Sequence, residues 1–116
     1  MQHEMKLNDA PFENIKSGTK TIEMRLNDEK RQQLRIHDHL IFQKASNPDE
    51  TLSTRIIALH YFPTFRDMTT ALQPALMGYT SEHMERLAQG DHGMYAYYSK
   101  EDEATYGVVG IEICLL

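Results

Sequence analysis

The chain has 116 residues, enough for one domain with one modest hydrophobic core, so a single domain over residues 1–116 is expected. Its hydrophobic fraction of 41% and charged fraction of 25% are typical of a folded globular protein and exclude a disordered chain. The net charge of −5 argues against binding nucleic acid through phosphates alone, because that mode needs a cationic surface.

The charges are divided unevenly along the chain. Residues 1–44 hold eight basic and seven acidic side chains, whereas residues 45–116 hold four basic and ten acidic ones. Any anion-binding site is therefore expected in the first half.

Several classes of protein are disfavoured by what the chain lacks. No stretch approaches the roughly 20 apolar residues of a membrane helix, and the first residues do not read as a secretion signal, so a cytoplasmic location is expected. The one cysteine, Cys114, cannot form an internal disulfide and is expected to be buried in its apolar terminal run. His37 and His39 would share a strand face, but no third ligand stands at a recognisable spacing, so neither a metal site nor a cofactor is predicted.

The first predicted elements are a strand at residues 4–8, where apolar and polar residues alternate, and a short helix after it. Asn8 or Asp9 can cap this helix, and Pro11 fits its first turn, where the missing N–H costs nothing. Gly18 is a natural terminator for it.

Residues 18–25 (Gly-Thr-Lys-Thr-Ile-Glu-Met-Arg) form the densest alternation of charged and apolar residues in the chain, which indicates a strand. Successive side chains of a strand point to opposite faces, so two sets are expected: Thr21, Glu23 and Arg25 on one face, and Lys20, Ile22 and Met24 on the other. A hydroxyl, a carboxylate and a guanidinium at this spacing can bind a polar, planar ligand. A half-buried strand with one solvated face, or an internal salt bridge of Glu23, produces the same pattern.

Turn signals and periodicity predict the remaining elements. The first group contains strands at residues 34–36 and 40–42 around a turn at His37 and Asp38, a turn at 46–50, and a long strand at 52–61. The second group begins with three helical segments: a helix at 65–72 capped by Thr64, one helical turn at 74–79 stopped by Gly78, and a helix after Thr80 or Ser81 whose Met84 and Leu87 point inward. It continues with a loop at 89–93, a helical turn or short strand at 94–99, an acidic turn at 100–105 and a closing strand at 107–115. Strands at both ends with helices between them suit a barrel, which leaves no sheet edge exposed.

The motif Gly-x-Lys-x-x-Glu-x-Arg at residues 18–25, just after a short helix, resembles the signature of the ASCH domain family, the activating-signal-cointegrator homology domains. Residues 25–31, 36–42, 97–99 and 106–111 resemble further segments of that family in the same order, although the family usually carries glycine where His37 stands. The resemblance covers most of the chain. It implies an α+β fold, namely a PUA-like β-barrel of about five to six strands with peripheral helices.

The resemblance also implies a polar cleft around the motif that binds RNA or a modified nucleoside. Lys20, Glu23 and Arg25 would contact the ligand, with Thr21 and Asp38 in support. Arginine offers a planar fork of donors, and a carboxylate can accept hydrogen bonds from amino groups of a base. Four tyrosines could either stack on bases or pack in the protein: Tyr95, Tyr97, Tyr98 and Tyr106.

Two alternative functions remain open. A bacterial branch of the superfamily looks like amidohydrolases that deacylate N4-acetylcytidine with a lysine, a threonine and a glutamate. Lys20 matches that lysine, whereas Glu23 stands in place of the threonine, so Lys20 and Glu23 would be the catalytic pair of an enzyme. The further acid is open among Asp67, Glu82 and Glu85. The other alternative is a protein-interaction module whose acidic second half meets a basic partner.

Overall fold

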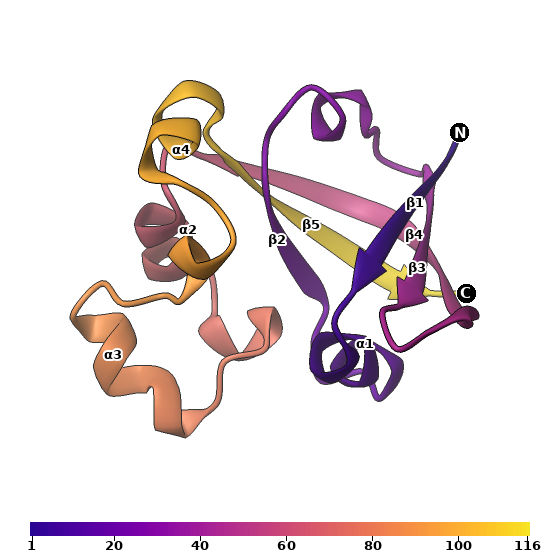
Figure 1. Cartoon of the computed structure of the whole chain (residues 1–116), viewed down its shortest axis with the longest axis horizontal. Coiled ribbons are helices and arrows are strands. Elements are labelled where there is room, and N and C mark those ends of the chain that lie inside the picture. Colours follow the sequence, from indigo (N-terminus) through magenta and orange to yellow (C-terminus); the bar gives the residue numbers. More distant parts are fainter.

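The structure is a computed structural model that describes residues 1–116, with five strands and four α-helices (Figure 1). In chain order these are β1 (Gln2–Leu7), α1 (Asp9–Lys16), β2 (Ile22–Leu26), β3 (His39–Lys44), β4 (Asn47–Phe62), α2 (Phe65–Ala71), α3 (Met84–Ala88), α4 (Lys100–Tyr106) and β5 (Val108–Leu115). Short 3-10 turns lie between them at Arg31–Gln33, Pro74–Met77, Ser81–His83 and Met94–Ala96. None of the helices has the length and apolar character needed to span a bilayer.

The strands form one sheet in the order β1-β3-β4-β5-β2, which curls into a half-barrel (Figure 1). β1 pairs with β3 in parallel, and the other neighbours pair antiparallel. β1 and β2 are the two edges of the sheet, and a hydrogen bond from Arg25 Nη2 to the Lys6 carbonyl oxygen, 2.9 Å long, links them. The predicted α+β fold with a barrel-type sheet is confirmed in the form of this five-stranded half-barrel.

Helix α1 lies at one end of the curled sheet (Figure 1). It begins at Asp9, whose charge suits a helix N-terminus, and Pro11 stands in its first turn as predicted. Phe12 and Ile15 are buried on its inner face. The chain leaves the helix at Gly18, whose φ of +86° is a left-handed conformation that glycine adopts without strain.

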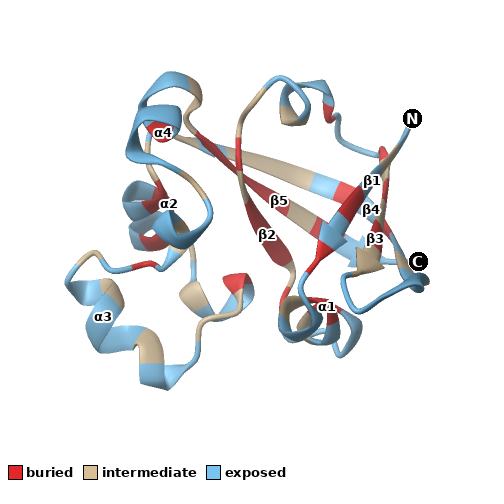
Figure 2. Cartoon of the chain, in the orientation of Figure 1, coloured by how far each residue is buried: buried red, intermediate tan, exposed pale blue.

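Two hydrophobic clusters hold these elements together, and the buried positions concentrate in the strands (Figure 2). The larger cluster joins the sheet to α1 and includes Leu40, Phe42 and Ile56. The smaller one joins β2 to α2 and includes Phe65 and Met68. The molecule therefore has a sheet part and a helical part that meet along β2.

β2 is buried on both faces although it is an edge strand. Ile22 and Met24 pack in the smaller cluster, whereas Glu23 and Arg25 point the other way and form an ion pair. The predicted division of these four side chains between two faces is confirmed.

Two predicted elements are wrong. Residues 34–36 are not a strand: the Arg35 N–H donates to the Asp38 carboxylate, and its guanidinium donates to the carbonyl oxygens of Gln32 and Leu34. Because local bonds use these groups, no sheet pairing forms there. Residues 100–105 are a helix, α4, rather than a turn, since Ser99 Oγ caps the N–H of Asp102 and acidic residues favour the first turn of a helix.

Smaller differences concern turns and exposure. The turn predicted at residues 46–50 is confined to Ala45 and Ser46, because β4 already begins at Asn47. Met84 is 39% exposed and does not point inward as predicted. Cys114 is exposed rather than buried, because it pairs with the exposed Arg55 in the β4–β5 ladder.

His37 adopts the left-handed conformation, with φ of +79°. The turn before β3 therefore keeps the geometry that glycine would supply in the family, despite a side chain at this position.

Candidate functional site

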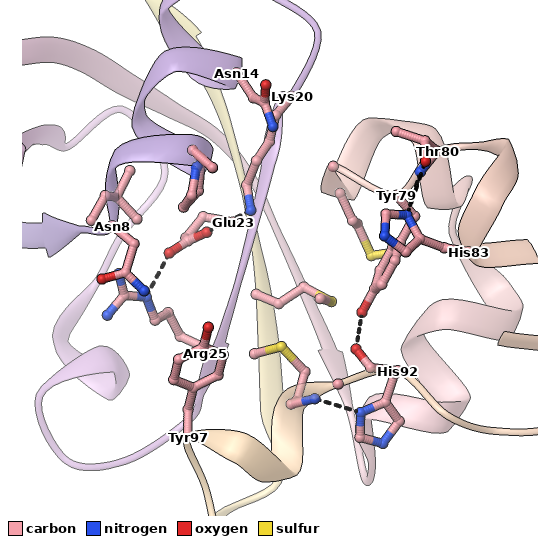
Figure 3. A pocket seen from close by; sticks show the side chains of 18 of the residues that line it. Asn8, Asn14, Lys20, Glu23, Arg25, Tyr79, Thr80, His83, His92 and Tyr97 are labelled. Atoms are coloured by element: carbon pink, nitrogen blue, oxygen red, sulfur yellow. Dashed lines mark hydrogen bonds and ion pairs between the residues drawn. The ribbon is translucent and has the colours of Figure 1, made fainter. Parts of the chain in front are cut away.

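A cavity of about 750 Å³ lies where the sheet part and the helical part meet (Figure 3). One wall comes from the end of β1, from α1 and from β2, and it carries Lys20, Glu23 and Arg25. The opposite wall comes from residues 77–94 and carries Tyr79, Thr80, His83 and His92 (Figure 3). Four residues of the 18–25 motif therefore line this cavity: Lys20, Glu23, Met24 and Arg25.

Lys20 reaches the cavity because it precedes β2 instead of belonging to it. Its N–H donates to the Asn14 carbonyl oxygen at 3.1 Å, and the next N–H, of Thr21, donates to the Leu76 carbonyl oxygen at 2.9 Å. The alternation of a strand does not apply to a residue held in this way. The prediction that Lys20 and Glu23 lie on opposite faces is wrong, since Lys20 Nζ lies 2.9 Å from Glu23 Oε1.

Glu23 is the centre of an ion cluster. Its Oε1 accepts from Lys20 Nζ, and its Oε2 accepts from Arg25 Nε at 2.7 Å. Glu23 is 5% exposed, Lys20 is 8% exposed and the Arg25 side chain is 15% exposed, so the three charges are largely shielded from water. Burial by itself raises the pKa of the Glu23 carboxyl, but the charges of Lys20 and Arg25 outweigh burial and hold this pKa below its usual value.

Arg25 joins the cluster to the other edge of the sheet. Burial lowers the pKa of its guanidinium, but Glu23 and, to a smaller degree, Tyr98 more than compensate and raise it. Arg25 Nη2 donates a hydrogen bond to the Lys6 carbonyl oxygen in β1. Arg25 thus links β1 to β2 in the wall of the cavity, in addition to carrying a charge.

The opposite wall is held by hydrogen bonds within residues 79–94. The Tyr79 hydroxyl donates to the His92 carbonyl oxygen, and burial, followed by the charge of Asp91, raises the pKa of Tyr79 to about 12. The Met94 N–H donates to His92 Nδ1 at 3.1 Å. Burial lowers the pKa of His92 despite the opposing charges of Glu103 and Asp91.

His83 is oriented in a similar way. The Thr80 N–H donates to His83 Nδ1 at 2.8 Å, so this nitrogen is an acceptor and the ring proton lies on Nε2. The ring faces the cavity from the wall opposite Glu23 (Figure 3).

The four tyrosines that could either stack on a base or pack in the protein are separated by the structure. Tyr97 and Tyr98 line the cavity, and Tyr97 is 67% exposed at its rim (Figure 3). Tyr95 instead packs edge-on against His92 and donates to the buried Glu103 carboxylate at 2.6 Å. Tyr106 lies elsewhere, with its hydroxyl 3.2 Å from Glu29 Oε1.

Two predicted supporting residues do not line the cavity, Thr21 and Asp38. Asp38 accepts from the Arg35 N–H at 3.1 Å and lies 2.8 Å from His3 Nε2. The hydrogen bond with His3, the largest cause, together with other contacts lowers the pKa of Asp38 to about 2. Asp38 therefore stabilises the turn before β3 at a distance from the motif.

None of the acids left open for a hydrolase is brought into the cavity lining, where the acidic side chains are Glu23 and Asp91. The missed part of the site is the wall formed by residues 77–94. Its local signals are Gly78 and Gly93, both with positive φ, which mark the sharp turns that shape this wall. Gly78 also packs against Lys20, since a Cβ there would lie 3.4 Å from Lys20 Cδ.

The cavity is more positive than the chain as a whole. Its lining holds four basic side chains, Lys6, Lys20, Arg25 and Arg86, against two acidic ones, although the net charge of the chain is −5. Three of these four basic residues come from the first half of the chain, where any anion-binding site is predicted.

Comparisons with known proteins agree on the family. Residues 5–116 match the ASCH domain model. The crystal structure of the hypothetical protein PH0355 is 30% identical over 100% of both chains, with a TM-score of 0.80. The solution structure of protein PF0455 from Pyrococcus furiosus is 32% identical over 100% of this chain and 98% of that one, with a TM-score of 0.73. No curated protein matches the chain significantly. The chain belongs to the ASCH domain family.

Proposed function

We propose that this cavity binds a nucleoside unit, either free or within single-stranded RNA. The observation that carries the proposal is the buried cluster of Lys20, Glu23 and Arg25 in the wall of a cavity of about 750 Å³. Such a cluster is weak evidence for a purely stabilising role, because a buried ion pair often stabilises a protein no better than apolar residues would. It does present fixed hydrogen-bonding groups to a ligand.

The dimensions and lining of the cavity suit a ligand of this size. Small-molecule sites typically enclose about 300–1,000 Å³ and combine apolar walls with a few fixed polar groups. Met24, Met77 and Met94 supply apolar surface here, and Tyr97 and Tyr98 supply aromatic surface on which a base can stack.

The charge distribution favours recognition of one unit over a long phosphate backbone. The basic side chains gather in the cavity, while the chain as a whole is acidic. A protein that neutralises many phosphates loses affinity steeply as salt rises, whereas a pocket that reads one nucleoside does not. We therefore expect binding that depends only weakly on salt concentration.

The test is isothermal calorimetry with the four ribonucleosides and with a short single-stranded RNA of mixed sequence, at two salt concentrations. Lys20→Ala should abolish binding, and Lys30→Ala, at an exposed lysine outside the cavity, is the matched control with the same change of charge. Absence of binding to every ligand, or equal binding by the two variants, refutes the proposal.

Hydrolysis of an acylated nucleoside is a second candidate, favoured by the Lys20–Glu23 contact of 2.9 Å inside the cavity. Because position 23 carries a carboxylate instead of a hydroxyl, the nucleophile would be water, and the Glu23 carboxylate would be the general base that takes its proton. Water would add to the acyl carbonyl carbon as Glu23 takes its proton, and the C–N bond would then break as this proton passes to the leaving nitrogen, which releases acetate and the free amine. The test is incubation of the protein with N4-acetylcytidine, while the release of cytidine and acetate is measured by chromatography. Binding of N4-acetylcytidine without release of acetate excludes hydrolysis.

A further inference from the structure

We infer that residues 80–93 form a lid over the cavity, that neutral His92 holds this lid closed, and that protonation of His92 releases it. The inference goes beyond the proposed function, because it concerns access to the cavity whatever ligand the cavity binds. It follows from how little of the lid is buried and from the chemistry of the contacts that hold it.

The lid supplies part of the cavity lining but none of the hydrophobic core. Its lining residues are Thr80, His83, Arg86, Asp91, His92 and Gly93. Tyr79 and Met94, which flank the lid, both pack against the smaller hydrophobic cluster, whereas neither cluster includes a residue of the lid. His92 is the one buried residue within it. A segment with so little buried surface opens more easily than the core does.

The lid has its own hydrogen bonds and can move as a unit. The Asp91 N–H donates to the Arg86 carbonyl oxygen at 2.8 Å, within the lid. Gly78 stands just before the lid and Gly93 at its end, with φ of +97° and +78°. Because glycine reaches more backbone conformations than other residues do, the chain can change direction at both places.

His92 fastens the lid to the helical part of the molecule. Its ring packs edge-on against the Tyr95 ring, with 4.7 Å between centroids, and lies 5.6 Å from the ring of the buried Phe65. His92 Nδ1 accepts from the Met94 N–H at 3.1 Å, and the His92 carbonyl oxygen accepts from the Tyr79 hydroxyl (Figure 3). Both donors lie outside the lid, so these bonds hold it at its base.

Protonation of the ring removes one of these bonds. Neutral His92 accepts with Nδ1 and carries its proton on Nε2, whereas an imidazolium carries a proton on both nitrogens. The new Nδ1–H would face the Met94 N–H, which places two donors 3.1 Å apart. The residue is 4% exposed, so the charged ring would also be largely cut off from water. Release of the lid relieves both penalties.

The charges near His92 do not compensate for its burial. The titratable and charged groups around it come from the lid, from α2, from residues 95–98 and from α4: Asp91, Arg66, Tyr95, Tyr98, Lys100 and Glu103. The carboxylates of Glu103 and Asp91 favour the charged ring, but burial is the larger effect and lowers the pKa of His92 below its ordinary value of 6.5. A released ring in water takes up a proton near pH 6.5, so protons bind more tightly to the open lid.

This difference sets the direction and the size of the pH effect. Well above pH 6.5 the ring is neutral in both states, and closure does not depend on pH. As the pH falls below 6.5, the open state gains its proton first and becomes more populated, until the pH passes the lower pKa of the closed state. Between about pH 7 and about pH 5 the ratio of open to closed lid rises by at most about 25-fold, the limit for a closed ring that is still neutral at pH 5.

The experiment measures hydrogen–deuterium exchange of the amides of residues 80–94 at these two pH values, corrected for the intrinsic pH dependence of exchange. Their protection should fall by about 3- to 25-fold in acid. Amides of β5 should stay more protected than those of the lid at both values, which distinguishes opening of the lid from unfolding of the sheet.

Two matched variants identify the histidine responsible. His92→Asn should abolish the fall, because an asparagine oxygen can accept from the Met94 N–H in place of Nδ1 and does not titrate. His83→Asn should keep the fall: His83 Nδ1 also accepts a backbone N–H, from Thr80 at 2.8 Å, but this histidine is not buried.

Three results overturn the inference: unchanged protection of the lid in the unmodified protein, a fall that persists in His92→Asn, and a fall that disappears in His83→Asn. If His92→Asn does not fold, NMR titration of the histidine rings in the unmodified protein decides instead. The lid must then open over the pH range in which the His92 ring gains its proton, and opening that follows another histidine overturns the inference as well. No ligand enters these measurements, so their failure leaves the proposed function intact.

Discussion

Replacing Glu23 with glutamine removes the one anion shared by Lys20 and Arg25, and this change should be among the most destabilising polar substitutions in the protein. Glu23 is 5% exposed and accepts ionic bonds of 2.9 and 2.7 Å. Removal of one partner from a buried ion pair costs about 3–5 kcal/mol. Since Arg25 keeps its bond to the Lys6 carbonyl oxygen, we expect the lower end, about 3 kcal/mol, or a loss of roughly 12 °C in Tm at about 4 °C per kcal/mol.

The measurement is urea unfolding followed by circular dichroism, with Glu13→Gln as the matched control. Glu13 also accepts a 2.7 Å bond, from Lys44, but its side chain is 49% exposed. An exposed pair contributes little because water and salt screen it, so Glu13→Gln should leave the free energy of unfolding nearly unchanged. If Glu23→Gln lowers the free energy of unfolding no more than Glu13→Gln does, burial of the ion cluster has no energetic consequence, which refutes the expected loss of about 3 kcal/mol.

The pH dependence of the Glu23→Gln effect supplies a second check. The pKa of Glu23 is lower in the folded state than its ordinary value of 4.5, so the carboxylate contributes stability above pH 4.5. This contribution is lost as the pH falls through the folded-state pKa. The difference between the unmodified protein and Glu23→Gln should therefore be constant near neutral pH and should shrink in acid; a difference that grows in acid would contradict the assigned charge state.

Three further changes test other parts of the structure. Asp38→Asn should lower Tm by a constant amount above pH 3.8 and by progressively less as the pH falls towards 2, because the folded-state pKa of Asp38 is about 2; a pH-independent effect would show that its ionisation is irrelevant. Glu103→Gln should lower the free energy of unfolding in urea by about 2 kcal/mol. The two oxygens of the buried carboxylate accept from the Phe65 N–H at 2.8 Å and from the Tyr95 hydroxyl at 2.6 Å, whereas an amide has only one oxygen that can accept. A loss well under about 1 kcal/mol would contradict this. Gly107→Ala should cost about 1–3 kcal/mol, because φ is +70° and a Cβ would lie 3.1 Å from the Phe62 carbonyl oxygen. Gly18→Ala, at φ of +86° with no atom within 4 Å, should cost less, and the opposite order would refute the steric part of the explanation.

Local patterns were sufficient for much of the fold. The Thr64 cap begins α2 as expected, with its side chain accepting from the Asp67 N–H at 3.0 Å, and Gly78 ends the turn at Pro74–Met77. The long strand also lies where its β-branched residues predict it, within β4. These features depend on residues a few positions apart, so the sequence contains the information directly.

Local patterns failed where the competing interaction is tertiary. The acidic run of α4 looked like a solvated turn, yet Glu103 is 5% exposed because the carboxylate binds the start of α2, 38 positions away. Residues 34–36 differ from the predicted strand for a local reason instead, because the carboxylate of Asp38 accepts a hydrogen bond from the Arg35 N–H three positions before it.

The candidate site divides in the same way. The sequence by itself singled out Lys20, Glu23 and Arg25 through the resemblance of their motif, and strand alternation placed Glu23 and Arg25 on one face of β2 but Lys20 on the other. Only the tertiary structure decided that Lys20 joins them and that residues 77–94 close the cavity opposite. The physical reason is that the two walls of the cavity come from segments more than 50 residues apart in the sequence, and their packing sets which side chains face each other. Periodicity and turn chemistry depend on residues a few positions apart, so they cannot predict this packing.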